Sequence, residues 1–147
     1  MNPETFWKQF ADDKKEQSNH SVWYFGDNEK DANELADLVL AGLKTATASV
    51  YELYELEGEQ VPTAGSYSVV TYWSGEACCI IRTNNVEIIP FGEVSEQFAF
   101  KEGEGDRTLD YWRKVHLECF ERDMAEHGLK VSSDTLVVCE EFELVHR

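Results

Sequence analysis

Apolar side chains recur at helical spacing in three separate stretches of the chain. In the first stretch an apolar stripe precedes a polar run, and Pro3 suits the first turn of a helix. The second stretch follows Asp27 or Asn28, either of which can cap a helix, and it stops at Gly42. The three predicted helices cover residues 3–17, residues from 27 or 28 to 42, and residues from about 108 to 128.

Shorter runs are rich in β-branched and aromatic residues, which is typical of strands. A tight turn at Ser74 and Gly75 joins two of these runs into a predicted hairpin. Residues 52–65 predict a short helical turn followed by a loop, and the glycines of residues 95–107 predict a second loop. The predicted extended segments are residues 22–25, 44–50, 66–73, 77–82, 86–91 and 134–145.

This order of elements lacks a regular alternation of strand and helix, and it contains no repeat. The fold class we predict is therefore α+β. Short antiparallel strands in this number usually close on themselves to hide their edges, so we expect a small β-barrel flanked by helices. Residues 1–21 are predicted to be a helical extension that packs on a domain formed by residues 22–147.

The composition is that of one globular domain of 147 residues, with 42% apolar residues and only three prolines. Its four cysteines form no CxxC pair, and we identify neither a leader segment nor an apolar run of the ~20 residues that span a bilayer. We therefore expect a soluble, cytoplasmic protein that does not bind membranes.

The net charge of −16 limits the partners of the chain. Tight non-specific binding of nucleic acid needs many lysine and arginine contacts to phosphate, so we do not expect bulk binding of duplex DNA. A nucleoside or a short single-stranded RNA held in a local pocket remains compatible with the charge. The oligomeric state cannot be deduced from the sequence.

A lone cation, Lys44, lies in the segment "AGLKTATASVY", in which no acidic residue occurs between Gly42 and Tyr51. One interpretation is a solvated lysine that meets the dipole at the end of a helix. The other is a lysine in a pocket, where desolvation shifts its chemistry.

The segments "GLKTAT" and "GEGDRTLDYWRKVH" resemble the ASCH domain family, a branch of the PUA-like β-barrels associated with RNA metabolism. The resemblance covers the chain from about Trp23 to the end. It implies a pocket at the mouth of the barrel, lined by the Lys44 segment, the central strands and the loop from Glu102 to Arg107. Some members are amidohydrolases that remove the acetyl group of N4-acetylcytidine, and others bind or cleave RNA.

The same resemblance implies a set of site residues. Lys44 and Thr47 match the Gly-x-Lys-x-x-Thr signature, and Glu104 is the expected catalytic glutamate, with Glu102 as the alternative. Many members have an arginine where this chain has Ser49. The expected substrate-binding residues are Glu102, Ser49, Arg82 and Arg107, of which either arginine is a candidate to replace the missing one.

Amide hydrolysis needs a nucleophile, a proton acceptor and a donor to the developing oxyanion. Thr47, Lys44 and a glutamate offer these groups, but Lys44 acts as a base only if it is unpaired, whereas an ion-paired Lys44 is a binding cation or an oxyanion stabiliser. A small hydrolase of acylated pyrimidine nucleosides and a non-catalytic RNA-binding module therefore both stay open. A ribonuclease is less compatible with the charge.

The basic residues near Lys44, Arg82 and Arg107 suggest a neutral-to-positive patch if the three segments converge, although adjacent acids can equally pair with them. Trp112 and His116 are spaced as on the buried face of a helix, which favours a core role over base stacking. His116, Cys119 and Glu121 lack the spacing of a metal site, so we expect no metal and no other cofactor.

Overall fold

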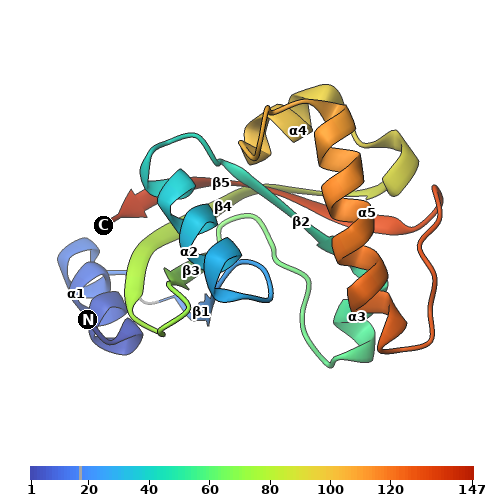
Figure 1. Ribbon diagram of the computed structural model, residues 1–147. Helices are drawn as coiled ribbons and strands as arrows, with labels where there is room; N and C mark the ends of the chain where they lie inside the picture. Colours follow the sequence, from blue (N-terminus) through green and yellow to red (C-terminus); the bar gives the residue numbers. More distant parts are fainter. Residues whose placement is uncertain (17) are drawn as a thin grey trace.

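A computed structural model describes residues 1–16 and 18–147 of the chain (Figure 1). Its elements are, in chain order, α1 (Pro3–Lys14), β1 (His20–Trp23), α2 (Glu29–Leu40), β2 (Ala46–Val50), α3 (Tyr51–Leu56), β3 (Tyr67–Thr71), β4 (Ala77–Pro90), the 3-10 turn η1 (Phe91–Glu93), α4 (Glu96–Glu102), α5 (Leu109–Ala125) and β5 (Leu136–His146).

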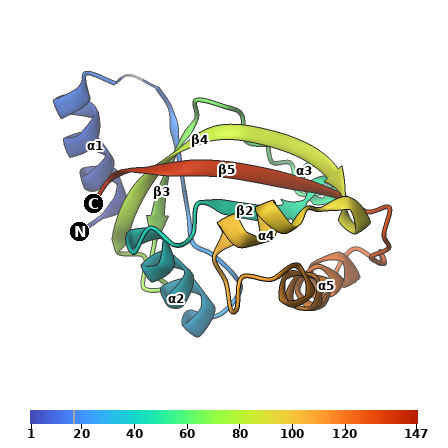
Figure 2. The ribbon, with the colours of Figure 1, turned by 90° about the horizontal axis from the view of Figure 1, so that it is seen from above.

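The five strands form one sheet in the order β1-β3-β4-β5-β2. Strand β1 runs parallel to β3, and every other neighbouring pair is antiparallel. The long strands β4 and β5 lie side by side and curve strongly (Figure 2). The prediction of an α+β fold is confirmed, but the prediction of a closed barrel is wrong, because β1 and β2 are edges of this sheet and do not pair with each other.

The first two helices pack on opposite faces of the sheet. Helix α1 contributes Phe6, Trp7 and Phe10 to a cluster with Val69 and Ile80. Helix α2, whose first turn is capped by Asn28, packs against the strand residues that alternate with these, namely Val70, Cys79 and Ile81. Successive strand residues point to opposite faces, so the two clusters lie on either side of β3 and β4.

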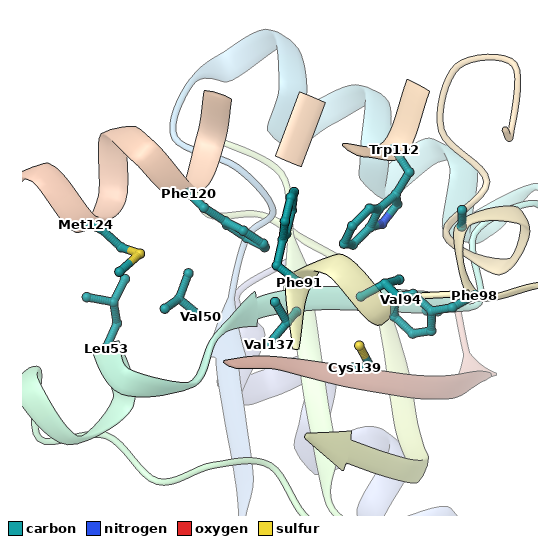
Figure 3. Close-up of a cluster of buried hydrophobic side chains, with 12 residues drawn as sticks. Val50, Leu53, Phe91, Val94, Phe98, Trp112, Phe120, Met124, Val137 and Cys139 are labelled. Atoms are coloured by element: carbon teal, nitrogen blue, oxygen red, sulfur yellow. The ribbon is translucent and has the colours of Figure 1, made fainter. Parts of the chain in front are cut away.

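Helices α4 and α5 cover the other end of the sheet. Their cluster contains Trp112, Phe120 and Met124 of α5, which pack over Val137 and Cys139 of β5 (Figure 3). Ala46, Ala48 and Val50 of β2 belong to the same cluster or pack against it. The alternate residues of β2 and β5, among them Thr47, Ser49 and Glu140, therefore point to the opposite face.

Several predicted boundaries change in the structure. The first helix ends at Lys14, and residue 17, the last of its predicted range, lies outside the described residues. The segments predicted at 77–82 and 86–91 are one strand, β4, and part of the predicted loop at 95–107 is helix α4. The division into an extension, residues 1–21, and a domain, residues 22–147, remains a prediction. Within the described part of the chain, no helix is both long and apolar enough to cross a bilayer.

Candidate functional site

Lys44 follows helix α2 and is the centre of a buried group of charged residues. The residue is 2% exposed, and its amine donates a hydrogen bond of 3.1 Å to the Glu104 carboxylate. A second bond of 3.4 Å goes to the backbone carbonyl of Glu102, and the ring centre of Phe25 lies 5.2 Å away. The interpretation of Lys44 as a solvated surface lysine is therefore wrong.

A close backbone contact brings the Lys44 segment against the end of α4. Thr45 donates its amide to the carbonyl of Lys101 at 2.7 Å. Gly103 has a φ of +72°, and a Cβ atom at this position would lie 2.1 Å from the carbonyl oxygen of Leu43. Only glycine allows this approach, so the glycines of the "EGEG" sequence position Glu104 beside Lys44.

Glu102 is 1% exposed and binds two side chains of α5. One of its oxygens accepts hydrogen bonds from Trp112 Nε1 at 2.7 Å and from His116 Nε2 at 2.8 Å. His116 Nδ1 lies 2.9 Å from the carbonyl of Trp112, and a carbonyl only accepts, so Nδ1 carries a proton. Nε2 faces the Glu102 carboxylate, and an ionised carboxylate also only accepts hydrogen bonds. Nε2 therefore carries a proton as well, and His116 is doubly protonated when Glu102 is ionised.

The pKa values of this group follow from burial and from the paired charges. Burial alone would raise the pKa of Glu102, but Lys44 and His116 outweigh it and lower this pKa to about 2. Burial would likewise lower the pKa of His116, but the Glu102 carboxylate raises it instead. Burial raises the pKa of Glu104 against the opposing effect of Lys44, and the negative Glu102 adds to the increase.

The second oxygen of Glu102, Oε1, is buried and has no hydrogen-bond partner among the described residues. Glu102, Glu104 and His116 place potential ligand atoms within 4.8 Å of one another, so these three residues could hold a metal ion. His116 thus belongs to a different set from the one with Cys119 and Glu121 that its sequence spacing suggested. Lys44 already supplies one positive charge to this set through its contact with Glu104.

A pocket of about 730 Å³ opens between the two edge strands. The lining residues come from β1 and the turn after it, from β2, α3 and the following loop, and from the central strands β3 and β5. Its lining consists of Ser21, Val22, Trp23, Tyr24, Phe25, Gly26, Thr47, Ser49, Tyr54, Glu59, Gln60, Val61, Pro62, Thr63, Ser66, Ser68 and Glu140.

The lining combines aromatic rings with hydroxyl groups and two carboxylates. Trp23, Tyr24, Phe25 and Tyr54 supply the aromatic surface. No lysine, arginine or histidine is found among the lining residues, so the neutral-to-positive patch suggested by the sequence does not form in this pocket. The acidic groups favour a ligand that carries hydrogen-bond donors over one that carries phosphate.

The structure divides the predicted site residues among a buried charged group, the pocket, and positions outside both. Lys44, Glu102 and Glu104 meet in the buried charged group, which adjoins the pocket at Phe25, a lining residue whose ring centre is 5.2 Å from the Lys44 amine. Thr47 and Ser49 line the pocket itself, where the Ser49 hydroxyl and the Tyr54 hydroxyl are 2.6 Å apart.

Neither arginine lies in the pocket lining. Arg82 is half-buried on β4, and its guanidinium lies 3.8 Å from the Glu143 carboxylate. Arg107 has a φ of +65°, stacks on Phe100 and donates to the carbonyl of that residue at 3.1 Å. Neither side chain therefore takes the place of the arginine that Ser49 replaces.

Sequence reasoning missed Glu140, Phe25 and His116 as parts of these sites. Glu140 occurs in a strand among other acids, and only its register opposite Thr47 places it in the pocket. His116 follows Trp112 at helical spacing, which is a signal for a shared face but not for a contact with Glu102. Phe25 was predicted as the last residue of an extended segment, but β1 ends at Trp23, and Phe25 lies after the strand, where it lines the pocket.

A family model described as ASCH domain matches residues 21–146. A solved structure of an ASCH domain from Lactobacillus crispatus JV V101 is 35% identical, with a TM-score of 0.93, over 99% of this chain and 94% of that one. A protein from Enterococcus faecalis V583 is 41% identical, with a TM-score of 0.92, over 99% of this chain and 88% of that one.

A third solved structure, of a hypothetical protein, is 14% identical with a TM-score of 0.58 over 86% of this chain and all of the other, and it shares the fold alone. None of the curated proteins compared with the chain matches it.

Proposed function

Since the chain belongs to the ASCH domain family, whose PUA-like fold is often linked to RNA binding, we propose that it binds a nucleobase in the pocket between β1 and β2. The base belongs to a nucleoside or to a short single-stranded RNA. The observation that carries this proposal is the aromatic wall formed by Trp23, Tyr24 and Phe25 beside a set of hydrogen-bonding side chains.

The size and chemistry of the pocket support this proposal. A volume of about 730 Å³ is within the range of ~300–1,000 Å³ typical of small-molecule sites. Aromatic side chains stack on the face of a base, and this contact tolerates every sequence. Hydroxyl groups such as those of Thr47 and Ser49 can bond to the polar edge of the base.

A second proposal, hydrolysis of an N4-acylated cytidine, is favoured by the contact of 3.1 Å between Lys44 and Glu104. In this reaction water adds to the acyl carbonyl while Glu104 accepts the proton of the water. The paired Lys44 stabilises the oxyanion, and the proton passes to the departing amine, which leaves cytidine and acetate. Burial, the main cause of the raised pKa of Glu104, suits a carboxylate to this role.

Hydrolysis at Lys44 also requires a conformational change. The amine of Lys44 is buried and is not part of the pocket lining, whereas the ring of Phe25 is. Phe25 lines the pocket and its ring centre lies 5.2 Å from the Lys44 amine, so movement of Phe25 is the route by which we propose the acyl group reaches Lys44. Thr47, which lines the pocket, is placed to hold the substrate before that step.

Both proposals are tested with the purified chain. Binding of cytidine, N4-acetylcytidine and a single-stranded oligoribonucleotide is measured through quenching of tryptophan fluorescence, with Trp23→Phe to assign the signal. Turnover of N4-acetylcytidine is followed by chromatography in wild type, Lys44→Ala, Glu104→Gln and the exposed control Lys30→Ala.

The hydrolase is supported if Lys44→Ala and Glu104→Gln lose turnover while Lys30→Ala keeps it. Binding without turnover supports a non-catalytic module. Absence of binding of all three compounds contradicts the proposed nucleobase pocket.

A further inference from the structure

Glu140 is a buried carboxylate that lines the pocket. In the sequence it is far from the segment that matches the Gly-x-Lys-x-x-Thr signature. It lies on β5, directly opposite Thr47 of β2, and it is 6% exposed. Burial of an ionised carboxylate is costly unless its charge is paired or its oxygens are hydrogen-bonded. The hydrogen-bond partners of the Glu140 carboxylate therefore indicate which group of a ligand could satisfy it.

One oxygen of Glu140 is held in place by the protein. Thr83 of β4, itself 1% exposed, donates its hydroxyl to Oε2 at 2.5 Å. The register between β4 and β5 shifts between Thr83 and Asn85, a bulge of the kind that redirects a side chain next to a functional site. The backbone of Thr83 is fixed in turn by hydrogen bonds of 2.7 and 2.8 Å with Gly65 and Ser66.

The other oxygen of Glu140 has no such partner. Among the described residues, Thr83 is the one hydrogen-bond partner of this carboxylate, and no cation forms an ion pair with it. Burial raises the pKa of Glu140, and the bond from Thr83 offsets part of that increase. An oriented, largely desolvated acceptor that lines a pocket is suited to a ligand that donates a hydrogen bond.

From this geometry we infer that Glu140 is a specificity-determining residue, which accepts a hydrogen bond from an exocyclic amino group of the bound base. The inference rests on the proposed nucleobase pocket and narrows its ligand to amino-bearing bases. The fixed carboxylate distinguishes a base that has the amino group from one that lacks it, since a bound base without a donor would cover the acceptor and leave it unpaired. The aromatic wall does not make this distinction, because stacking depends little on the base.

The test removes the amino group from the ligand and the acceptor from the protein. Cytidine is compared with pyrimidin-2-one riboside, which has the same ring without the amino group, by titration against wild type, Glu140→Gln and Glu140→Met. Wild type is expected to bind cytidine at least about tenfold more tightly than pyrimidin-2-one riboside, because the second compound lacks the hydrogen bond to a charged acceptor. The ratio falls to about threefold in Glu140→Gln, which keeps a neutral acceptor, and to about one in Glu140→Met.

A matched control is Glu141→Gln, which makes the same charge change one residue further along β5. Glu141 pairs with Lys101 and Asn85 and is not a lining residue, so this variant should keep the wild-type ratio. The urea midpoint of each variant establishes that it is folded. If Glu140→Met does not fold, Glu140→Gln still tests the inference, because it retains an acceptor for the Thr83 hydroxyl.

Two results overturn the inference in different ways. If wild type binds cytidine but the ratio stays the same in Glu140→Gln, or starts near one, the role of Glu140 is wrong and the nucleobase pocket stands. If wild type binds neither riboside nor any other nucleobase, the proposed function fails and this role fails with it.

Discussion

The Lys44 amine and the Glu104 carboxylate lie 3.1 Å apart, and their side chains are 1% and 16% exposed. An ion pair with so little solvent contact depends on both partners, because removal of one leaves the other charge buried without compensation. This pair joins the end of α2 to the loop between α4 and α5, which are distant in the sequence.

We expect Lys44→Met to lower the free energy of unfolding by about 3–5 kcal/mol, since it leaves two glutamates in a buried site without the ammonium. The double variant with Glu104→Gln should recover part of that loss. Urea denaturation measures both. The control is Lys30→Met, which removes an exposed partner of Glu34 and should change stability by less than about 0.5 kcal/mol. An equal loss in both lysine variants would contradict the importance of burial.

The pair of His116 and Glu102 predicts a stability window in pH. Glu102 has a lowered pKa of about 2, so its contribution is present above the ordinary value of 4.5 and is lost as pH falls toward 2. His116 has a raised pKa, so its contribution is complete below 6.5 and is lost as pH rises through the higher folded value. The difference in unfolding free energy between wild type and His116→Gln should therefore be largest between about pH 4.5 and 6.5. A difference that does not vary with pH would show that the pair is not charged.

Gly103→Ala tests the close approach that positions Glu104. The added Cβ atom would meet the carbonyl of Leu43, and the residue would also keep an unfavourable positive φ. We expect a loss of at least about 2 kcal/mol in unfolding free energy. Gly58→Ala is the matched control, because Gly58 has a φ of +69° but no atom within 4 Å of its Cβ position, and it should lose only about 1 kcal/mol. Equal losses in the two variants would mean that the contact with Leu43 relaxes without cost.

The acidic pocket predicts discrimination against phosphate. We expect cytidine to bind more tightly than cytidine 5′-monophosphate by about threefold to tenfold at low salt, because Glu59 and Glu140 line the pocket without a basic residue. The ratio should shrink at 0.5 M salt and in Glu59→Gln, both of which weaken the repulsion. Fluorescence titration gives both constants. Tighter binding of the monophosphate would place a cation near the ligand and contradict this charge assignment.

The residues of the buried charged group could largely be identified from the sequence. The Gly-x-Lys-x-x-Thr signature and the glycines around Glu104 are short-range signals, and they mark two segments that the fold brings together at Lys44. The resemblance favoured Glu104 as the catalytic glutamate, with Glu102 as the alternative, and both glutamates belong to the group. Glu104 contacts the lysine amine through its side chain, and Glu102 does so through its backbone carbonyl.

The pocket residues were harder to predict because strand register decides them. The alternation in "ATASV" separates Thr47 and Ser49 from the core-facing alanines, but it does not show that Glu140 lies opposite Thr47. The assumption of a closed barrel failed for a related reason. Short edge strands of four and five residues present little unpaired backbone, so the sheet does not need to close to protect them.

The sheet stays open between β1 and β2, and within the sheet these two edge strands are linked through β3, β4 and β5. A ligand bound between these edge strands would contact both of them and link them directly, which the backbone hydrogen bonds of the sheet do not do. Occupancy should then slow amide hydrogen exchange in β1 and β2 together, although these strands share no hydrogen bond.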